Sequence, residues 1–167
     1  LELARAREPA AHAGELPPTR SSAQDLAYGA LRRYGFGDAI LSALLARPLA
    51  APEIRALLLC ALYRLETRPD AAHTVVDQTV EAAGQIAHGN FRGLVNGVLR
   101  NYLRQQAVLI PGLAGDEAIY RHPAWWVDRL RHAYPDRWVQ IVEAGNGQPS
   151  MTLRVNQRRG SRDAYLQ

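Results

Sequence analysis

The segment from Phe91 to Arg104 has the clearest pattern of apolar and polar positions in the chain. Its apolar residues recur at the i, i+3, i+4 and i+7 spacing of one buried helical face: Phe91, Leu94, Val95, Val98, Leu99, Tyr102 and Leu103. A polar stripe repeats every fourth position beside them: Arg92, Asn96, Arg100 and Arg104. The pattern predicts an amphipathic helix that is either a scaffold element or a nucleic-acid surface. Gly93 and Gly97 lie inside it and are expected to permit close approach of another helix.

Helical spacing also predicts four further helices before this one: residues 21–34, 38–46, 52–65 and 73–87. Gly35 and Gly37 are expected to separate the first two. The helix that begins at Pro52 is apolar almost all round, so we expect it to be the central one. Short connections and the lack of alternating segments predict an all-α bundle over residues 21–107. Residues 1–20 are interrupted by proline and glycine and are expected to form a poorly ordered arm.

The pattern changes after residue 110. Residues 108–149 predict a linker with two short amphipathic helices, one that begins at His122-Pro123 and one at Pro135-Asp136. Residues 151–155 alternate as a β-strand does, and Ser161 has the position of a helix N-cap. One strand and part of a helix cannot bury a face alone. We therefore expect residues 150–167 to be the start of a further domain in a longer protein.

Composition narrows the class of protein. Hydrophobic residues make up 47% of the chain, which is ample for a core, and no apolar run approaches the ~18 residues of a membrane span. The first residues lack the apolar segment of a signal peptide. Cys60 is the single cysteine, which excludes an internal disulfide and a zinc site built on paired cysteines. The expected location is the cytoplasm, with no membrane partner.

Charge is distributed unevenly along the chain. The basic side chains are all arginine, and the formal net charge is +4. Residues 1–91 hold 9 Arg and 10 acidic residues, whereas residues 92–167 hold 11 Arg and 6 acidic residues. A basic second half suggests a polyanionic partner, although an ordinary solvated surface would give the same count.

Most candidates for chemistry in this sequence have a plainer interpretation. Cys60 lies among leucines, where a cysteine behaves as a small hydrophobic residue. The histidines never form an i, i+4 pair around a carboxylate, which argues against metal or general-base roles: His12, His73, His88, His122 and His132. Tryptophans at helical spacing are expected in the core rather than stacked on bases: Trp125, Trp126 and Trp138. The sequence predicts no catalytic, cofactor-binding or metal-binding residue in this chain.

Two groups of arginines are candidates for RNA contact, because the planar guanidinium binds phosphate in a bidentate manner and stacks on bases. The first group lies on the striped helix: Arg92, Arg100 and Arg104. The second is denser and surrounds the predicted strand: Arg154, Arg158, Arg159 and Arg162. For the first group, pairing with neighbouring carboxylates is an equally good interpretation. For the second, phosphate contact is favoured.

The bundle resembles the NusB-like RNA-binding fold, and GLVNGVLRNYLR looks like its signature helix. The segment YRHPAWWVDRLRHAYPDRWVQIVEAGNGQPSMTLRVNQRRGSRDAYL resembles the linker and first methyltransferase segment of the ribosomal RNA small-subunit methyltransferase B family. The upstream pieces LAYGALR, LLARPL, LYRLETRPDAAHTVVDQTVEAA and NFRGLVNGVLR match the same family in the same order. The resemblance covers about residues 20 to 167.

This resemblance implies a function for a longer protein. The family uses S-adenosylmethionine to methylate C5 of a cytosine in 16S ribosomal RNA. A family cysteine attacks C6 of the base, and a second cysteine assists product release. Both belong to a Rossmann-like domain expected beyond Gln167, and Cys60 matches neither of them. The role implied for this chain is to bind and orient rRNA, with the first strand of an RNA-recognition-like subdomain at its end.

Two other functions are open on the sequence. A free-standing antitermination factor of the NusB type would bind RNA and a ribosomal protein without catalysis, and a purely protein-interaction domain would bind no RNA. The HPAWW…TLRVN continuation argues against the first, because a free-standing factor has no reason to carry a strand after its bundle. Oligomeric state cannot be inferred from these patterns.

Overall fold

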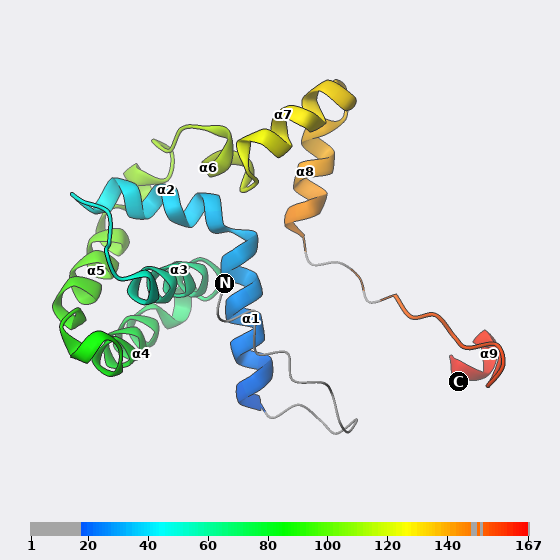
Figure 1. Cartoon of the computed structure of the whole chain (residues 1–167), viewed down its shortest axis with the longest axis horizontal. Coiled ribbons are helices and arrows are strands. Elements are labelled where there is room, and N and C mark those ends of the chain that lie inside the picture. Colours follow the sequence, from blue (N-terminus) through cyan, green and yellow to red (C-terminus); the bar gives the residue numbers. More distant parts are fainter. Residues whose placement is uncertain (1–17, 148–149, 151, 167) are drawn as a thin grey trace.

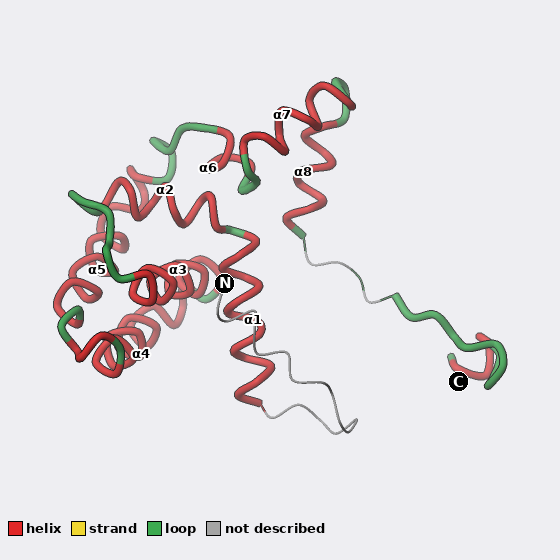
Figure 2. Tube along the Cα trace, viewed as in Figure 1, coloured by secondary structure: helices red, strands yellow, loops and turns green. Residues whose placement is uncertain are grey.

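The computed structural model describes residues 18–147, 150 and 152–166 (Figure 1). Five helices form the body of the fold: α1 (Pro18–Arg32), α2 (Tyr34–Leu44), α3 (Pro52–Thr67), α4 (Ala72–Gln85) and α5 (Arg92–Leu109). Two 3₁₀ turns, Pro69–Ala71 and Ala87–Gly89, connect α3 to α4 and α4 to α5. Figure 2 shows helices and loops throughout the described part of the chain, so the predicted all-α bundle is confirmed. Of the expected arm, Pro18–Arg20 belong to α1 and the remainder lies outside the described residues.

Helix α3 is the centre of the bundle, as its sequence predicted. It contacts α1, α2, α4 and α5, and its Ile54 and Leu58 side chains are fully buried. Val95 and Leu99 of α5 are buried in the same core. Burial of such side chains stabilises the fold by about 1.5–3 kcal/mol each. The regular apolar faces of α3 and α5 therefore fix the arrangement of the five helices.

The expected break at Gly35 and Gly37 is wrong, because both glycines lie inside α2. A Cβ on Gly37 would lie 2.8 Å from Leu59 Cδ2, and one on Gly35 would lie 2.9 Å from the Glu117 carbonyl carbon. The two glycines therefore let α2 pack closely against α3 and against a segment after α5. This use of glycine outweighs its low helix propensity.

The expected role of Gly93 and Gly97 is also wrong. A Cβ on either residue would meet no atom within 4 Å. Helix α5 packs on the bundle through Val95, Val98 and Leu99, which leaves the two glycines on the opposite side. Leu94, expected in the buried stripe, is 39% exposed for the same reason. The buried face is therefore narrower than the apolar stripe predicted.

The described part of the linker, up to residue 147, has three helices rather than the predicted two: α6 (Asp116–Tyr120), α7 (Ala124–Ala133) and α8 (Trp138–Asn146). Helices α7 and α8 match the predicted pair. Helix α6 has five residues, too few to give a periodic pattern. It lies against α2, with Glu117 over Gly35 (Figure 1).

Arg131 joins the three helices of this segment. Its guanidinium donates two hydrogen bonds to Asp116 of α6, at 2.6 and 2.7 Å, and stacks over the Trp138 ring of α8 at 4.4 Å. Bidentate pairs of this kind fix geometry as well as charge. Tyr120 adds an edge contact to Trp138, with ring centroids 4.9 Å apart. One arginine therefore holds α6, α7 and α8 together.

The ion pair between Arg131 and Asp116 should make the contact between α6 and α7 sensitive to acid. Hydrogen bonds from Arg131 hold the pKa of the Asp116 carboxyl below its ordinary value of 3.8. Because the pKa of Asp116 is lower in the folded protein than in the unfolded one, its ionised carboxyl stabilises the fold in full above the ordinary value of 3.8. This contribution is lost as the pH falls through the pKa of the folded protein. We expect Asp116→Asn to lower the melting temperature at pH 7 and to have a smaller effect at about pH 3. A difference independent of pH would contradict this assignment.

The Glu66 carboxylate, which contacts two arginines, holds the segment after α5 against the bundle. Glu66 of α3 accepts from Arg121 at 2.8 Å and lies 3.0 Å from Nε of Arg33, and all three side chains are about three-quarters buried. Arg121 also lies over the Phe36 ring at 4.9 Å. Asn146, at the end of α8, donates to the Tyr120 carbonyl oxygen at 3.0 Å. These contacts place α6 and the start of α7 against the bundle.

The predicted strand is not formed in the described residues. Residues 152–156 have no regular secondary structure, and Met151 lies outside the described part of the chain. A strand forms only with a partner for its backbone hydrogen bonds, and no described residue pairs with this segment. The helix predicted after Ser161 is present as α9 (Arg162–Tyr165), and Ser161 Oγ accepts from the Ala164 amide at 3.2 Å.

Candidate nucleic-acid interface

The arginines of α5 are exposed and are held by neutral side chains. Arg100 Nε donates to Asn96 Oδ1 at 2.8 Å, and Arg104 Nη2 donates to Asn101 Oδ1 at 3.3 Å. An amide fixes a guanidinium without cancelling its charge, whereas a carboxylate would neutralise it. The helix therefore presents these two arginines as full positive charges.

Arg92 lies at the start of α5, beside the end of α4. A Cβ on Gly84 would lie 3.2 Å from Arg92 Cδ, so the absence of a side chain at Gly84 leaves room for the arginine stem. Apolar stems of long basic side chains commonly lie along such surfaces while the charged group stays in water. The structure thus places Arg92, Arg100 and Arg104 on one helix, as the four-residue spacing predicted.

The alternative interpretation, that these arginines pair with carboxylates, does not hold in the described residues, where other arginines form the ion pairs. In residues 18–147, 150 and 152–166, the ion pairs use Arg33, Arg55, Arg64, Arg68, Arg121 and Arg131. None of the seven candidate arginines is among them. The arginines that fix the fold and those that remain available for a partner are therefore separate groups.

The second candidate group lies on a different part of the chain. All four of its arginines are exposed: Arg154, Arg158, Arg159 and Arg162. Asn156 shapes the turn between them, because its Oδ1 accepts from the Arg158 amide at 3.0 Å and its carbonyl oxygen from the Arg159 amide at 2.8 Å. Figure 1 shows this segment extending from the helical body on the side away from α5. The structure does not bring the two groups together.

The tryptophans differ from their expected core position. Trp125 is 64% exposed and Trp126 is 37% exposed, and their rings form an edge contact at 5.8 Å between centroids. Trp138 is half-buried, with the Arg131 guanidinium over its ring. The error at Trp125 and Trp126 arises because α7 buries only the face that carries Val127 and Leu130.

Cys60 has the position beside the core that its leucine neighbours predicted. Cys60 packs against the core, and burial raises the pKa of its thiol, which opposes thiolate chemistry. His122 lies at a helix junction, with Nδ1 2.8 Å from the Tyr120 carbonyl oxygen. His12 lies outside the described residues. Within the described residues, no group of three or more His, Cys, Asp or Glu side chains is placed to hold a metal ion.

A polar groove that the sequence did not predict lies between α1, the end of α3 and the end of α8. Its volume is about 530 Å³, and ten residues line it: Ser21, Gln24, Asp25, Tyr28, Gly29, Arg32, Arg33, Tyr63, Thr67 and Asn146. Because these residues are up to 125 positions apart in the chain, no local pattern could have identified them. Gly29 lets α1 approach α3, since a Cβ there would overlap the Tyr63 ring.

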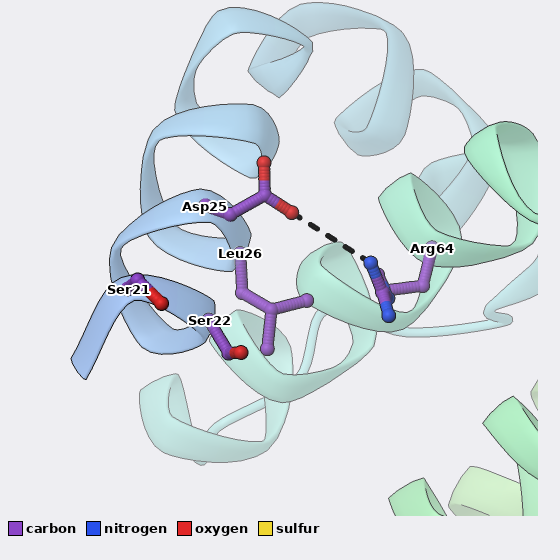
Figure 3. Close-up of a pocket in the computed structure, with 5 residues that line it drawn as sticks. All are labelled: Ser21, Ser22, Asp25, Leu26 and Arg64. Carbon is purple, nitrogen blue, oxygen red and sulfur yellow. Dashed lines mark ion pairs between the residues drawn. The ribbon is translucent and has the colours of Figure 1, made fainter. Parts of the chain in front are cut away.

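A second depression lies next to this groove and is lined by Ser21, Ser22, Asp25, Leu26 and Arg64. Figure 3 shows Asp25 of α1 facing Arg64 of α3, where the two form an ion pair at 3.6 Å. Neither depression has a glycine-rich loop after a strand, the usual cradle for a nucleoside cofactor. The described residues therefore do not fit S-adenosylmethionine.

Comparison with known proteins identifies two parts in the chain. Residues 2–104 match the model of the NusB family, and residues 122–167 match that of the methyltransferase RsmF/B-like, ferredoxin-like domain. The first match extends to Arg104 of α5, and the second includes α7, α8 and the second arginine group. Among the described residues, no helix has the length and apolar character needed to cross a membrane.

Similar curated proteins include the ribosomal RNA small subunit methyltransferase B of Escherichia coli O6:H1 (strain CFT073), of E. coli O17:K52:H18 and of Shigella boydii serotype 18. Each is 39% identical to the chain over 145 residues, which are 86% of the chain and 34% of the relative. The chain thus spans about a third of the length of these relatives. Because the family match over residues 2–104 covers more than half of its length, the chain belongs to the NusB family.

Proposed function

We propose that this chain is the RNA-binding and RNA-positioning part of an S-adenosylmethionine-dependent methyltransferase that acts on C5 of a cytosine in 16S rRNA. The observation that carries the proposal is that the seven arginines of the two candidate groups are all exposed and have no carboxylate partner in the described residues. They lie on two segments, one of which matches the NusB family and the other the methyltransferase RsmF/B-like, ferredoxin-like domain. The proposed partner is 16S rRNA, and the proposed location is the cytoplasm.

The proposed role follows from the chemistry of the residues present. Phosphate contacts from arginine fix the position and orientation of a nucleic acid without reading its sequence. A base to be methylated at C5 must be held away from its stack, so the strand on either side of it must be anchored. In the proposed whole protein, S-adenosylmethionine supplies the methyl group. The residues of this chain bind and orient the rRNA.

The test uses the exposed arginines of α5. We expect the triple variant R92A/R100A/R104A to bind a 16S rRNA fragment about tenfold more weakly than the wild type at ~0.15 M salt, because each lost phosphate contact removes counterion release. Asn96→Asp should also weaken binding, since it places a carboxylate beside Arg100. The measurement is fluorescence anisotropy of labelled RNA over a salt series.

Arg68→Ala is the matched control, because Arg68 is exposed but lies 3.6 Å from Asp70. Its removal should change the affinity by less than twofold. If the wild-type chain showed no RNA binding even at ~50 mM salt, the proposal would be wrong and a protein-interaction domain would be favoured. Equal losses for the control and the triple variant would contradict the choice of these residues.

A further inference from the structure

The groove between α1, α3 and α8 contains the parts of a nucleotide site. We infer that it binds one or two unpaired nucleotides of the RNA, with a base stacked on Tyr28 and a phosphate on Arg32. This inference rests on the proposed function and adds a contact that neither arginine group supplies. The volume of about 530 Å³ lies within the range of roughly 300–1,000 Å³ typical of ligand sites.

Tyr28 offers a surface for stacking. It lines the groove from α1, and its side chain is 49% exposed although the residue next to it, Gly29, is buried against Tyr63. The close approach at Gly29 fixes the distance between α1 and α3, and so the shape of the groove beside Tyr28. A rigid aromatic ring in a polar groove suits an unpaired base, because every base has a face that can stack.

Arg32 supplies the positive charge of the groove. It is exposed, lies one helical turn after Tyr28, and forms no ion pair within the described residues. The other charged groups of the lining are already engaged. Arg33 lies beside Glu66, and Asp25 accepts from the Tyr63 hydroxyl and pairs with Arg64 (Figure 3). A phosphate at Arg32 therefore meets a net positive surface.

Asn146 connects the groove to the end of α8. Its Nδ2 donates to the Tyr120 carbonyl oxygen, whereas its Oδ1 is buried and has no hydrogen-bond partner. A buried acceptor without a donor is unfavourable, and a donor on the edge of a bound base that reached Oδ1 would satisfy it.

These features favour single-stranded RNA over a duplex or a peptide. A stacking ring and a base-edge acceptor inside a groove are accessible only to an unpaired base, since paired bases are stacked on each other. An apolar peptide would require an apolar lining, whereas all nine lining residues other than Gly29 carry a polar group. The groove is thus expected to discriminate between unpaired and paired RNA of the same length.

The test compares variants of the 167-residue chain with a labelled 12-nucleotide single-stranded RNA and with a duplex of the same length. Tyr28→Ala is expected to weaken binding of the single strand about fivefold or more, and Tyr28→Phe to preserve it. Arg32→Ala should weaken binding about threefold and lower the salt slope by about 0.7, the value for one contact with a single strand. Tyr134→Ala and Arg129→Ala are matched controls, because both residues are exposed on α7 or directly after it and lie outside the groove. RNA carrying 5-iodouridine should cross-link to Tyr28 on irradiation.

The inference fails if Tyr28→Ala and Tyr134→Ala bind the single strand as tightly as the wild type and Tyr28 forms no cross-link. Stronger binding of the duplex than of the single strand would also overturn it. In either case, RNA binding that still depends on the two arginine groups would leave the proposed function intact. Circular dichroism melting of each variant distinguishes loss of binding from loss of folding.

Discussion

Replacing Gly35 with alanine is expected to separate α6 from α2 and to lower the stability of the chain by about 2–3 kcal/mol, the cost of forcing an extra carbon into a packed contact. The new Cβ would lie 2.9 Å from the Glu117 carbonyl carbon and closer still to its oxygen. Backbone atoms cannot move aside as a flexible side chain can. Helix α6 must therefore shift, and the contacts of Arg121 with Glu66 and Phe36 would be lost with it.

Hydrogen exchange measures this effect locally. In Gly35→Ala, the amides of α6 and of the start of α7 should exchange about 30- to 100-fold faster, whereas those of α3 should change much less. The matched control is Gly97→Ala, the same substitution inside α5 at a position where no atom lies within 4 Å. That variant should be stabilised by about 0.5–1 kcal/mol, because alanine is the better helix former. Equal destabilisation of both variants would contradict the close contact between α2 and α6.

The second large effect is expected in RNA binding. The triple variant R154A/R158A/R159A should bind a 16S rRNA fragment about 10- to 100-fold more weakly than the wild type at ~0.15 M salt. The three side chains lie within six residues, are exposed and have no carboxylate partner in the described residues. Removing them takes the densest group of free positive charges from the chain.

A lysine series separates charge from geometry. R154K/R158K/R159K keeps the three charges but replaces each planar fork with a single ammonium group. We expect this variant to keep most of the salt dependence of the wild type and to lose a smaller part of its affinity. If the lysine and alanine variants bound equally weakly, the interaction would depend on guanidinium geometry rather than on phosphate charge.

The fold could be predicted from the sequence where apolar spacing was sufficient evidence. The central position of α3 and the buried face of α5 follow from regular burial of Leu58 and Leu99. The glycines could not be assigned in this way: the sequence predicts a helix break at Gly35 and a close approach at Gly97, whereas the structure has the close approach at Gly35. Whether a glycine contacts a neighbour depends on tertiary packing, which places Gly35 against α6 and Gly97 in open space.

The candidate site was predictable in part for a similar reason. The four-residue spacing identified the arginines of α5, and local density identified the group around Arg158. The sequence could not predict that these arginines have no carboxylate partner in the described residues. Ion pairs can join residues that are far apart in the chain, as those of Arg33 and Arg121 with Glu66 do over 33 and 55 positions. The groove could not be predicted for the same reason, since its lining residues Tyr28 of α1 and Asn146 of α8 are 118 positions apart in the chain.

The central claim is that this chain positions rRNA through phosphate contacts, and the salt dependence of binding tests it most directly. The measurement is log Kd against log salt concentration for a 16S rRNA fragment with the wild-type chain and with R154A/R158A/R159A. We predict a steep dependence for the wild type and a slope lower by about two for the variant, at ~0.7 per contact with a single strand. Identical affinities and identical slopes for the two proteins would contradict the claim.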